Sequence, residues 1–107
     1  MKAPAIALAV LVSGCAAAAD DNLAGCTIAH TIAEKAATAH QAGVPLPGLL
    51  ERIATLEPDA DDVLRDLAKG ITIAAYKQPR YSTEEFRQDA ITDFANAVMV
   101  QCLDTLE

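Results

Sequence analysis

The sequence predicts an all-α protein: a small up-down-up-down four-helix bundle closed by one disulfide and preceded by an export signal. Three observations support this prediction. Apolar residues recur at helical spacing in four stretches that proline or glycine separates. Cys26 and Cys102 stand near the two ends of the region that these stretches span. An apolar leader before them indicates a compartment in which cysteines pair.

Residues 1–19 have the pattern of a secretory signal peptide. Lys2 supplies their only charge, an apolar block covers residues 5–12, and small residues follow it. The apolar block is shorter than the roughly 20 residues that a bilayer core requires. We therefore expect no membrane span in the mature chain, and a single helical domain over residues 20–107 in the periplasm or outside the cell.

Two processing routes are open for this leader. Cleavage after Ala19 follows small residues and releases a soluble protein, and signal length favours this route. The run Val12-Ser13-Gly14-Cys15 instead resembles a bacterial lipobox, in which Cys15 becomes the lipidated first residue of an envelope lipoprotein. In either case Cys15 leaves the pool of free thiols.

The mature chain is acidic and has two remaining cysteines. Residues 20–107 hold seven basic and fifteen acidic side chains, a net charge of −8, which disfavours binding to nucleic acid or to an anionic membrane surface. An even number of cysteines in an exported chain predicts a Cys26–Cys102 disulfide. Closing a loop of that size stabilises a small domain by about 4.5 kcal/mol on the chain-entropy model.

The first helix is predicted over residues 22–42. Small and apolar residues recur along it at helical spacing, beginning at Cys26. Its end is marked by Gly43, which suits the left-handed position after a helix, by Val44 as the following apolar contact, and by Pro45, which cannot continue a helix.

The second and third helices are predicted over residues 47–56 and 59–76. Pro47 takes the first helical position of the second helix, and Asp59 is the expected N-cap of the third. Gly70 leaves open whether the third helix is continuous, kinked or broken. The β-branched run after Gly70 is compatible with a strand, but the chain offers no partner strand, so we expect a helix there.

The fourth helix is predicted over residues 83–105 and has the clearest start signal. Ser82 and Glu85 have the spacing of a capping box, in which each side chain binds the other's backbone amide. Tyr81 and Phe86 have the spacing of a hydrophobic staple. In an up-down-up-down bundle the start of the first helix lies beside the end of the fourth, which is where the two cysteines fall.

No motif in the chain predicts catalysis, a cofactor or a metal. His30 and Glu34 lie one turn apart, but two ligands on one helix do not complete a metal site, and a solvated ion pair is the expected outcome. The acids at 59–62 lack the glycine and glutamate of a calcium loop and fit a helix N-terminus instead. We therefore expect a non-enzymatic protein with no catalytic, cofactor-binding or metal-binding residues.

One segment differs from its surroundings in composition. It combines tyrosine with basic residues, the types that favour protein interfaces, and its candidate partner contacts are Tyr76, Lys77, Arg80, Tyr81 and Arg87. The competing interpretation is local: one tyrosine staples the helix, the other packs on the core, and the charges solvate a turn. The sequence leaves both open.

Scattered positions over most of the mature chain resemble a group of small, exported, uncharacterised helical proteins of proteobacteria. The matching stretches are Cys26, Gln41-Ala42-Gly43-Val44-Pro45, Ala75-Tyr76, Pro79-Arg80-Tyr81-Ser82-Thr83-Glu84, Ile91, Asp93-Phe94 and Cys102. The resemblance implies export and a helical two-cysteine domain, and no activity. A looser similarity joins the chain to HdeA-type periplasmic acid-stress chaperones, whose cysteines lie closer together in sequence.

Three functional hypotheses follow. The first is a periplasmic binding or accessory protein with an unknown protein partner. The second is an acid-stress chaperone, because protonation of the carboxylates would reverse the net charge and loosen a thin core. The third is a lipid-anchored envelope protein, if Cys15 is processed.

Overall fold

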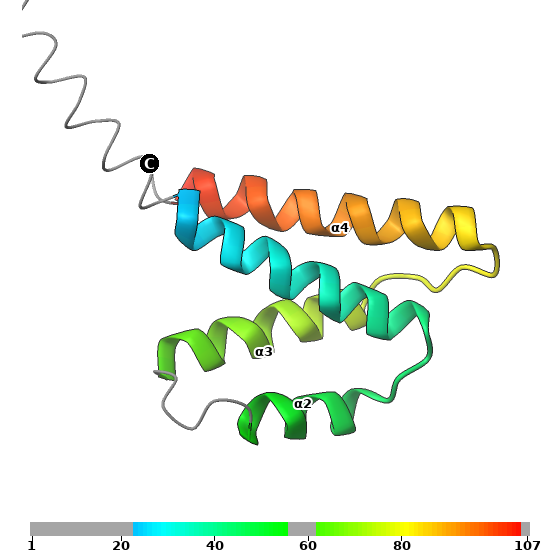
Figure 1. Ribbon diagram of the computed structural model, residues 1–107, viewed down its shortest axis with the longest axis horizontal. Helices are drawn as coiled ribbons and strands as arrows, with labels where there is room; N and C mark the ends of the chain where they lie inside the picture. The colour runs from blue at the N-terminus through cyan, green and yellow to red at the C-terminus, as the bar shows by residue number, and fades with distance from the viewer. Residues whose placement is uncertain (1–22, 56–61, 106–107) are drawn as a thin grey trace, which may run out of the picture.

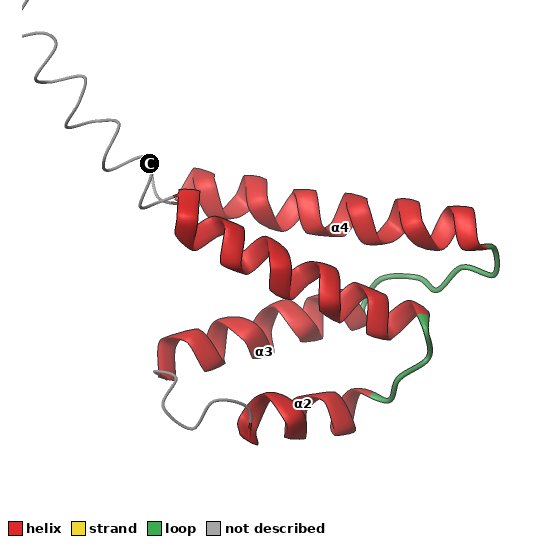
Figure 2. Cartoon of the chain, viewed as in Figure 1, coloured by secondary structure: helices red, strands yellow, loops and turns green. Residues whose placement is uncertain are grey.

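The computed structural model describes residues 23–55 and 62–105, and these residues form helices and connections with no strand among them (Figure 1). Figure 2 shows the same division into helix and loop. The helices cover residues 23–41, α2 (Leu46–Thr55), α3 (Asp62–Tyr76) and α4 (Glu84–Thr105). The all-helical class is therefore confirmed. The predicted start of the third helix, residues 59–61, lies outside the described residues, as do the leader and Cys15.

The predicted disulfide is present. Cys26 in the 23–41 helix is bonded to Cys102 in α4, with the two Cα atoms 5.6 Å apart. Cys26 is completely buried. The bond holds the first part of the 23–41 helix against the last part of α4, which lie together in Figure 1.

Alanine makes up most of the core among the described residues: six of the nine buried apolar side chains are alanine. One buried cluster joins three helices through Ala29, Ala33, Ile71 and Ala95. Because alanine ends at Cβ, the helices approach closely but bury little apolar area per residue. The core is therefore thin, as four aromatic residues and no tryptophan in the chain would suggest.

The α2 helix contributes no buried residue. It packs along α3, and in Figure 1 it lies on the side of α3 that faces away from α4. The half-buried residues Leu49, Leu50 and Ile53 form an apolar stripe along this helix. The buried core is thus a property of three helices. None of the helices in the described ranges combines the length and hydropathy that crossing a bilayer demands.

The 23–41 helix ends as predicted, in a Schellman motif. Gly43 has a φ of 84°, the left-handed conformation that glycine adopts without steric cost. The Val44 amide donates to the Ala39 carbonyl at 3.0 Å, and the Gly43 amide donates to the His40 carbonyl at 3.1 Å. These bonds fix the direction in which the chain leaves the helix.

The α3 helix runs without interruption through Gly70, which settles the question that the sequence left open. A Cβ added at Gly70 would meet no other atom within 4 Å. The β-branched residues after it are helical, and Ile71 and Thr72 are buried. The Thr72 hydroxyl donates to the Ala68 carbonyl at 2.7 Å, so its polar group is satisfied within the helix.

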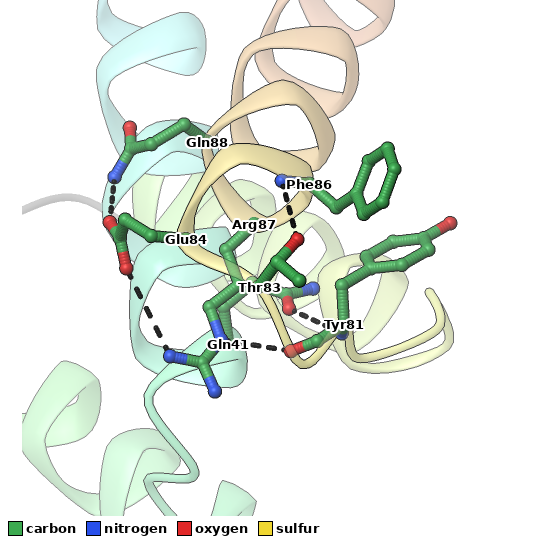
Figure 3. A network of polar contacts seen from close by, with 7 residues as sticks. All are labelled: Gln41, Tyr81, Thr83, Glu84, Phe86, Arg87 and Gln88. Atoms are coloured by element: carbon green, nitrogen blue, oxygen red, sulfur yellow. Dashed lines mark hydrogen bonds and ion pairs between the residues drawn. The ribbon is translucent and has the colours of Figure 1, made fainter.

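The N-cap of α4 is Thr83, and the predicted capping box at Ser82 is wrong by one residue. The Phe86 amide donates to the Thr83 hydroxyl at 3.3 Å (Figure 3), and the Arg87 amide donates to the Thr83 carbonyl at 3.0 Å. In this register residue N3 is Phe86, which cannot reach back as a glutamate does. The Tyr81 and Phe86 rings are neighbours nonetheless, with centroids 6.3 Å apart.

Candidate functional site at the connecting segment

The connecting segment, residues 77–83 between α3 and α4, is held to the last turn of the 23–41 helix by Gln41. This side chain is buried, at 4% exposure. Its Nε2 donates to the Pro79 carbonyl at 2.8 Å, and its Oε1 accepts a hydrogen bond from the Tyr81 amide at 3.0 Å (Figure 3). One amide side chain therefore fixes the segment's backbone at two points, as a paired strand would.

His40 and Tyr76 add a second set of contacts at the same end. The His40 Nε2 donates to the Gln78 carbonyl at 2.7 Å, which requires that this nitrogen carries a proton. The imidazole lies against the Tyr76 ring, with centroids 4.6 Å apart. The Tyr76 hydroxyl donates to the Val44 carbonyl at 2.6 Å, and burial raises the pKa of this phenol above its usual 10.0.

Arg80 packs over the turn that ends the 23–41 helix. Its Nη2 lies 3.0 Å from the position that a Cβ would occupy on Gly43. Two reasons favour glycine at position 43: its φ is positive, and a side chain there would meet the Arg80 guanidinium. The guanidinium also lies near the helix C-terminus, where the helix dipole favours a positive charge.

The first turn of α4 is tied back to the connecting segment by Arg87. Its Nε donates to the Tyr81 carbonyl at 2.8 Å, and its Nη1 lies 3.9 Å from a carboxylate oxygen of Glu84. The other oxygen of Glu84 accepts a hydrogen bond from Gln88 at 2.9 Å. Figure 3 shows this network beside Gln41 and Thr83.

The five candidate contacts thus gather at one end of the molecule but have different roles. Tyr76, Arg80 and Arg87 make contacts within the protein. The Lys77 side chain is exposed and makes no ion pair or hydrogen bond with another described residue. Tyr81 is 40% exposed and its neighbour Phe86 56% exposed. Among the exposed side chains of this end are Lys77 and the aromatic pair Tyr81 and Phe86.

A groove of about 450 Å³ lies beside the connecting segment. One wall is α4; the other is formed by the last turns of the 23–41 helix and α3, with the connecting segment at one side. The lining is mostly alanine and other apolar residues, with polar groups from His40, Gln41, Gln78, Asp93 and Gln101. Among the described residues that line the groove, Asp93 is the only carboxylate and none is lysine or arginine. The groove is partly open to solvent.

Gln41, His40 and Asp93 are residues whose role the sequence analysis missed. An isolated glutamine or histidine in the last turn of a helix carries no signal of what it contacts, because its partners lie about 40 residues away in sequence. The placement of Gln41 immediately before a helix-ending glycine could at most have suggested that its side chain lies near a chain reversal. Asp93 is one of many acids in an acidic chain.

The other candidates in the sequence do not form a site within the described residues. His30 Nδ1 lies 3.2 Å from a Glu34 carboxylate oxygen, the solvated pair that the spacing predicts. No group of three metal-ligating side chains occurs among the described residues. The acids at 59–61 lie outside the described ranges, and the disulfide occupies both thiols of Cys26 and Cys102.

Comparison of the chain with protein-family models, with curated proteins and with solved structures found no match. The resemblance to small exported helical proteins stays a prediction. Function must accordingly be argued from the geometry of this chain alone.

Proposed function

We propose that this chain is a small exported, non-enzymatic helical protein that binds a protein partner at the end formed by the connecting segment and the groove. The observation that carries the proposal is the exposed pair Tyr81 and Phe86 on a backbone that Gln41, Arg87 and Thr83 hold in place. Aromatic side chains favour interfaces, and a backbone already ordered loses less entropy on binding.

The up-down-up-down order of the helices belongs to this proposal. Short connections at residues 42–45 and 77–83 support it. The disulfide supports it too, because an antiparallel order brings the start of the first helix beside the end of the last.

Export to the periplasm or beyond is likewise proposed. A disulfide that persists is typical of an oxidising compartment. The intact mass of the protein from its native host, before and after reduction and alkylation, tests this directly. It reports whether cleavage follows Ala19 or precedes Cys15, and whether an acyl chain is attached as in a lipid-anchored envelope protein.

Photocrosslinking in the native host tests partner binding at this end. A benzophenone amino acid replaces Tyr81, and in the control it replaces Lys35, an exposed residue of the 23–41 helix outside the groove. We expect one protein adduct of defined mass from position 81 and none from position 35. Equal labelling from both positions, or none from 81, contradicts the assignment of this end.

An acid-stress chaperone is the second candidate, and the thin alanine core favours it. Large apolar side chains already stand exposed, including Val63 at 77% and Val100 at 57%. Protonation of the carboxylates near pH 2–3 would make the chain positive and loosen the helices further. Suppression of a client protein's acid aggregation supports this candidate, and no suppression removes it.

A further inference from the structure

We infer that the groove beside the connecting segment binds an extended peptide segment carrying a lysine or arginine, whose charge meets Asp93. The inference rests on the proposed function and adds the chemistry of the partner. Three features of the groove carry it: one carboxylate and two amide side chains that bond to no other described residue, and a length that suits a peptide.

Asp93 sets the charge of the occupant. It is an exposed residue of α4 in a mostly apolar lining that also holds one histidine and three glutamines, and it makes no ion pair or hydrogen bond with another described residue. The protein carries a net charge of −7, so the surrounding field adds to the attraction for a cation. A lysine or arginine side chain suits this groove, because its aliphatic part can lie along the apolar lining while its charged end reaches the Asp93 carboxylate.

Gln78 and Gln101 supply the means of holding a peptide backbone. Both line the groove, Gln78 from the connecting segment and Gln101 from near the end of α4. Neither side-chain amide makes a hydrogen bond with another described residue. Each offers both a donor and an acceptor, the complement of a peptide group. Gln41, by contrast, already uses both ends of its amide on the connecting segment.

The dimensions favour a peptide over a small enclosed ligand. The α4 wall runs from Ala90 to Gln101, which spans about 16 Å at 1.5 Å per residue. That length accommodates about five residues of extended chain. Because the groove is partly open to solvent, such a segment can continue beyond it, which an enclosed cavity would prevent.

The test uses the mature protein with its disulfide intact and two short peptides that bear the same uncharged fluorophore. The peptides differ only in a central lysine or glutamate between leucines. We expect the lysine peptide to bind more tightly by fluorescence anisotropy and to shift the backbone amide resonances of Ala90 and Ala97. The Asp93→Asn variant should weaken its binding roughly three- to fivefold.

Asp89→Asn is the matched control, because it removes the same charge from an exposed position of α4 outside the groove. It should weaken binding by less than about twofold, the share of long-range attraction. Ala97→Trp, which fills the groove from an exposed position, should abolish binding. Unchanged circular dichroism and unfolding midpoint for each variant establish that the fold is intact.

Each contrary outcome overturns a defined part of the inference. Equal weakening by Asp89→Asn and Asp93→Asn means general charge attraction, and no groove site. Equal binding of both peptides, blocked by Ala97→Trp, removes the basic side chain from the inference but leaves the groove as a protein-binding site. Absence of binding by either peptide overturns the inference, while the proposed partner contact is judged separately by the crosslink from position 81.

Discussion

The two ends of the 23–41 helix are held to the rest of the protein by different means. Near its start, Cys26 is covalently bonded to Cys102 of α4. At its last turn, His40 and Gln41 hold the backbone of the connecting segment by hydrogen bonds alone. The first end depends on two side chains. The second end depends on a set of polar groups, each of which costs free energy if its partner is lost.

Under the proposed function, this difference separates a structural end from the end that contacts the partner. The disulfide end requires no further polar chemistry, and its Cys26 is buried completely. The hydrogen-bonded end carries the exposed aromatic pair Tyr81 and Phe86, and the groove extends from it along α4 as far as Gln101, next to Cys102. Because it is closed by reversible bonds, it can open locally while the disulfide keeps the helices together. Under the proposed function, a partner would adjust this end without unfolding the domain.

The largest expected effect comes from breaking the covalent end. The double variant Cys26→Ala, Cys102→Ala should lose about 4.5 kcal/mol of unfolding free energy, because the unfolded chain is no longer constrained over nearly its whole length. For a domain with an alanine core, a loss of that size approaches the total stability. Urea unfolding of the variant and of the oxidised protein measures the difference, and a loss below about 1 kcal/mol would contradict the role given to the bond.

Breaking the hydrogen-bonded end should cost about half as much. Gln41→Leu keeps the size of the side chain but leaves the Pro79 carbonyl and the Tyr81 amide without partners, a loss of about 2 kcal/mol. Hydrogen exchange at the Tyr81 amide should accelerate in parallel. Gln78→Leu is the control, because that side chain makes no hydrogen bond with another described residue, and it should change stability little. If both variants lose the same free energy of unfolding, the hydrogen bonds of Gln41 do not stabilise the protein.

The covalent end was predictable from the sequence, and the hydrogen-bonded end was not. Cysteine arithmetic and helix lengths are enough to pair Cys26 with Cys102. Gly43 was equally accessible, because the left-handed turn after a helix is decided by local chemistry. The bonds of Gln41 depend on a segment about 40 residues away, and glutamine has no preference that identifies such a partner.

The groove and the helix cap show the same limit. The groove exists only where three elements leave space between them, so no stretch of sequence contains it. At the cap, Ser82 and Thr83 are both good N-cap residues, and local preference barely separates them. The tertiary contacts of the connecting segment decide which of the two residues becomes the N-cap, and these contacts cannot be read from the local sequence.

The cap gives a third prediction, of about 1 kcal/mol. Thr83→Ala removes the hydroxyl that accepts from the Phe86 amide and should lower the free energy of unfolding by about that amount. Ser82→Ala is the neighbouring control and should cost less than about 0.3 kcal/mol, because no hydrogen bond of its side chain is lost. If Ser82→Ala lowers the free energy of unfolding more than Thr83→Ala does, in thermal or urea unfolding, then Ser82 is the N-cap as the sequence predicted.

The smallest effect is expected from pH, and it also belongs to the hydrogen-bonded end. Burial raises the pKa of the Tyr76 phenol above 10.0, so the folded protein retains this proton where the unfolded chain loses it. The corresponding stability is complete below pH 10 and is lost as pH rises through the raised, folded-state pKa. The disulfide end has no counterpart, because bonded cysteines do not titrate.

Tyr76→Phe isolates this contribution. It should cost about 0.5–1 kcal/mol near neutral pH, because the hydrogen bond to the Val44 carbonyl is lost, and it should flatten the decline in stability between about pH 9 and pH 11. The chain has two tyrosines, so Tyr81→Phe leaves Tyr76 as its only phenol, and phenolate absorbance then reports that group alone. A titration midpoint at or below 10.0 in the folded Tyr81→Phe protein would mean that Tyr76 is open to water. The hydrogen-bonded end would then open frequently in solution. The two ends would differ more in local stability than the hydrogen bonds of His40 and Gln41 imply.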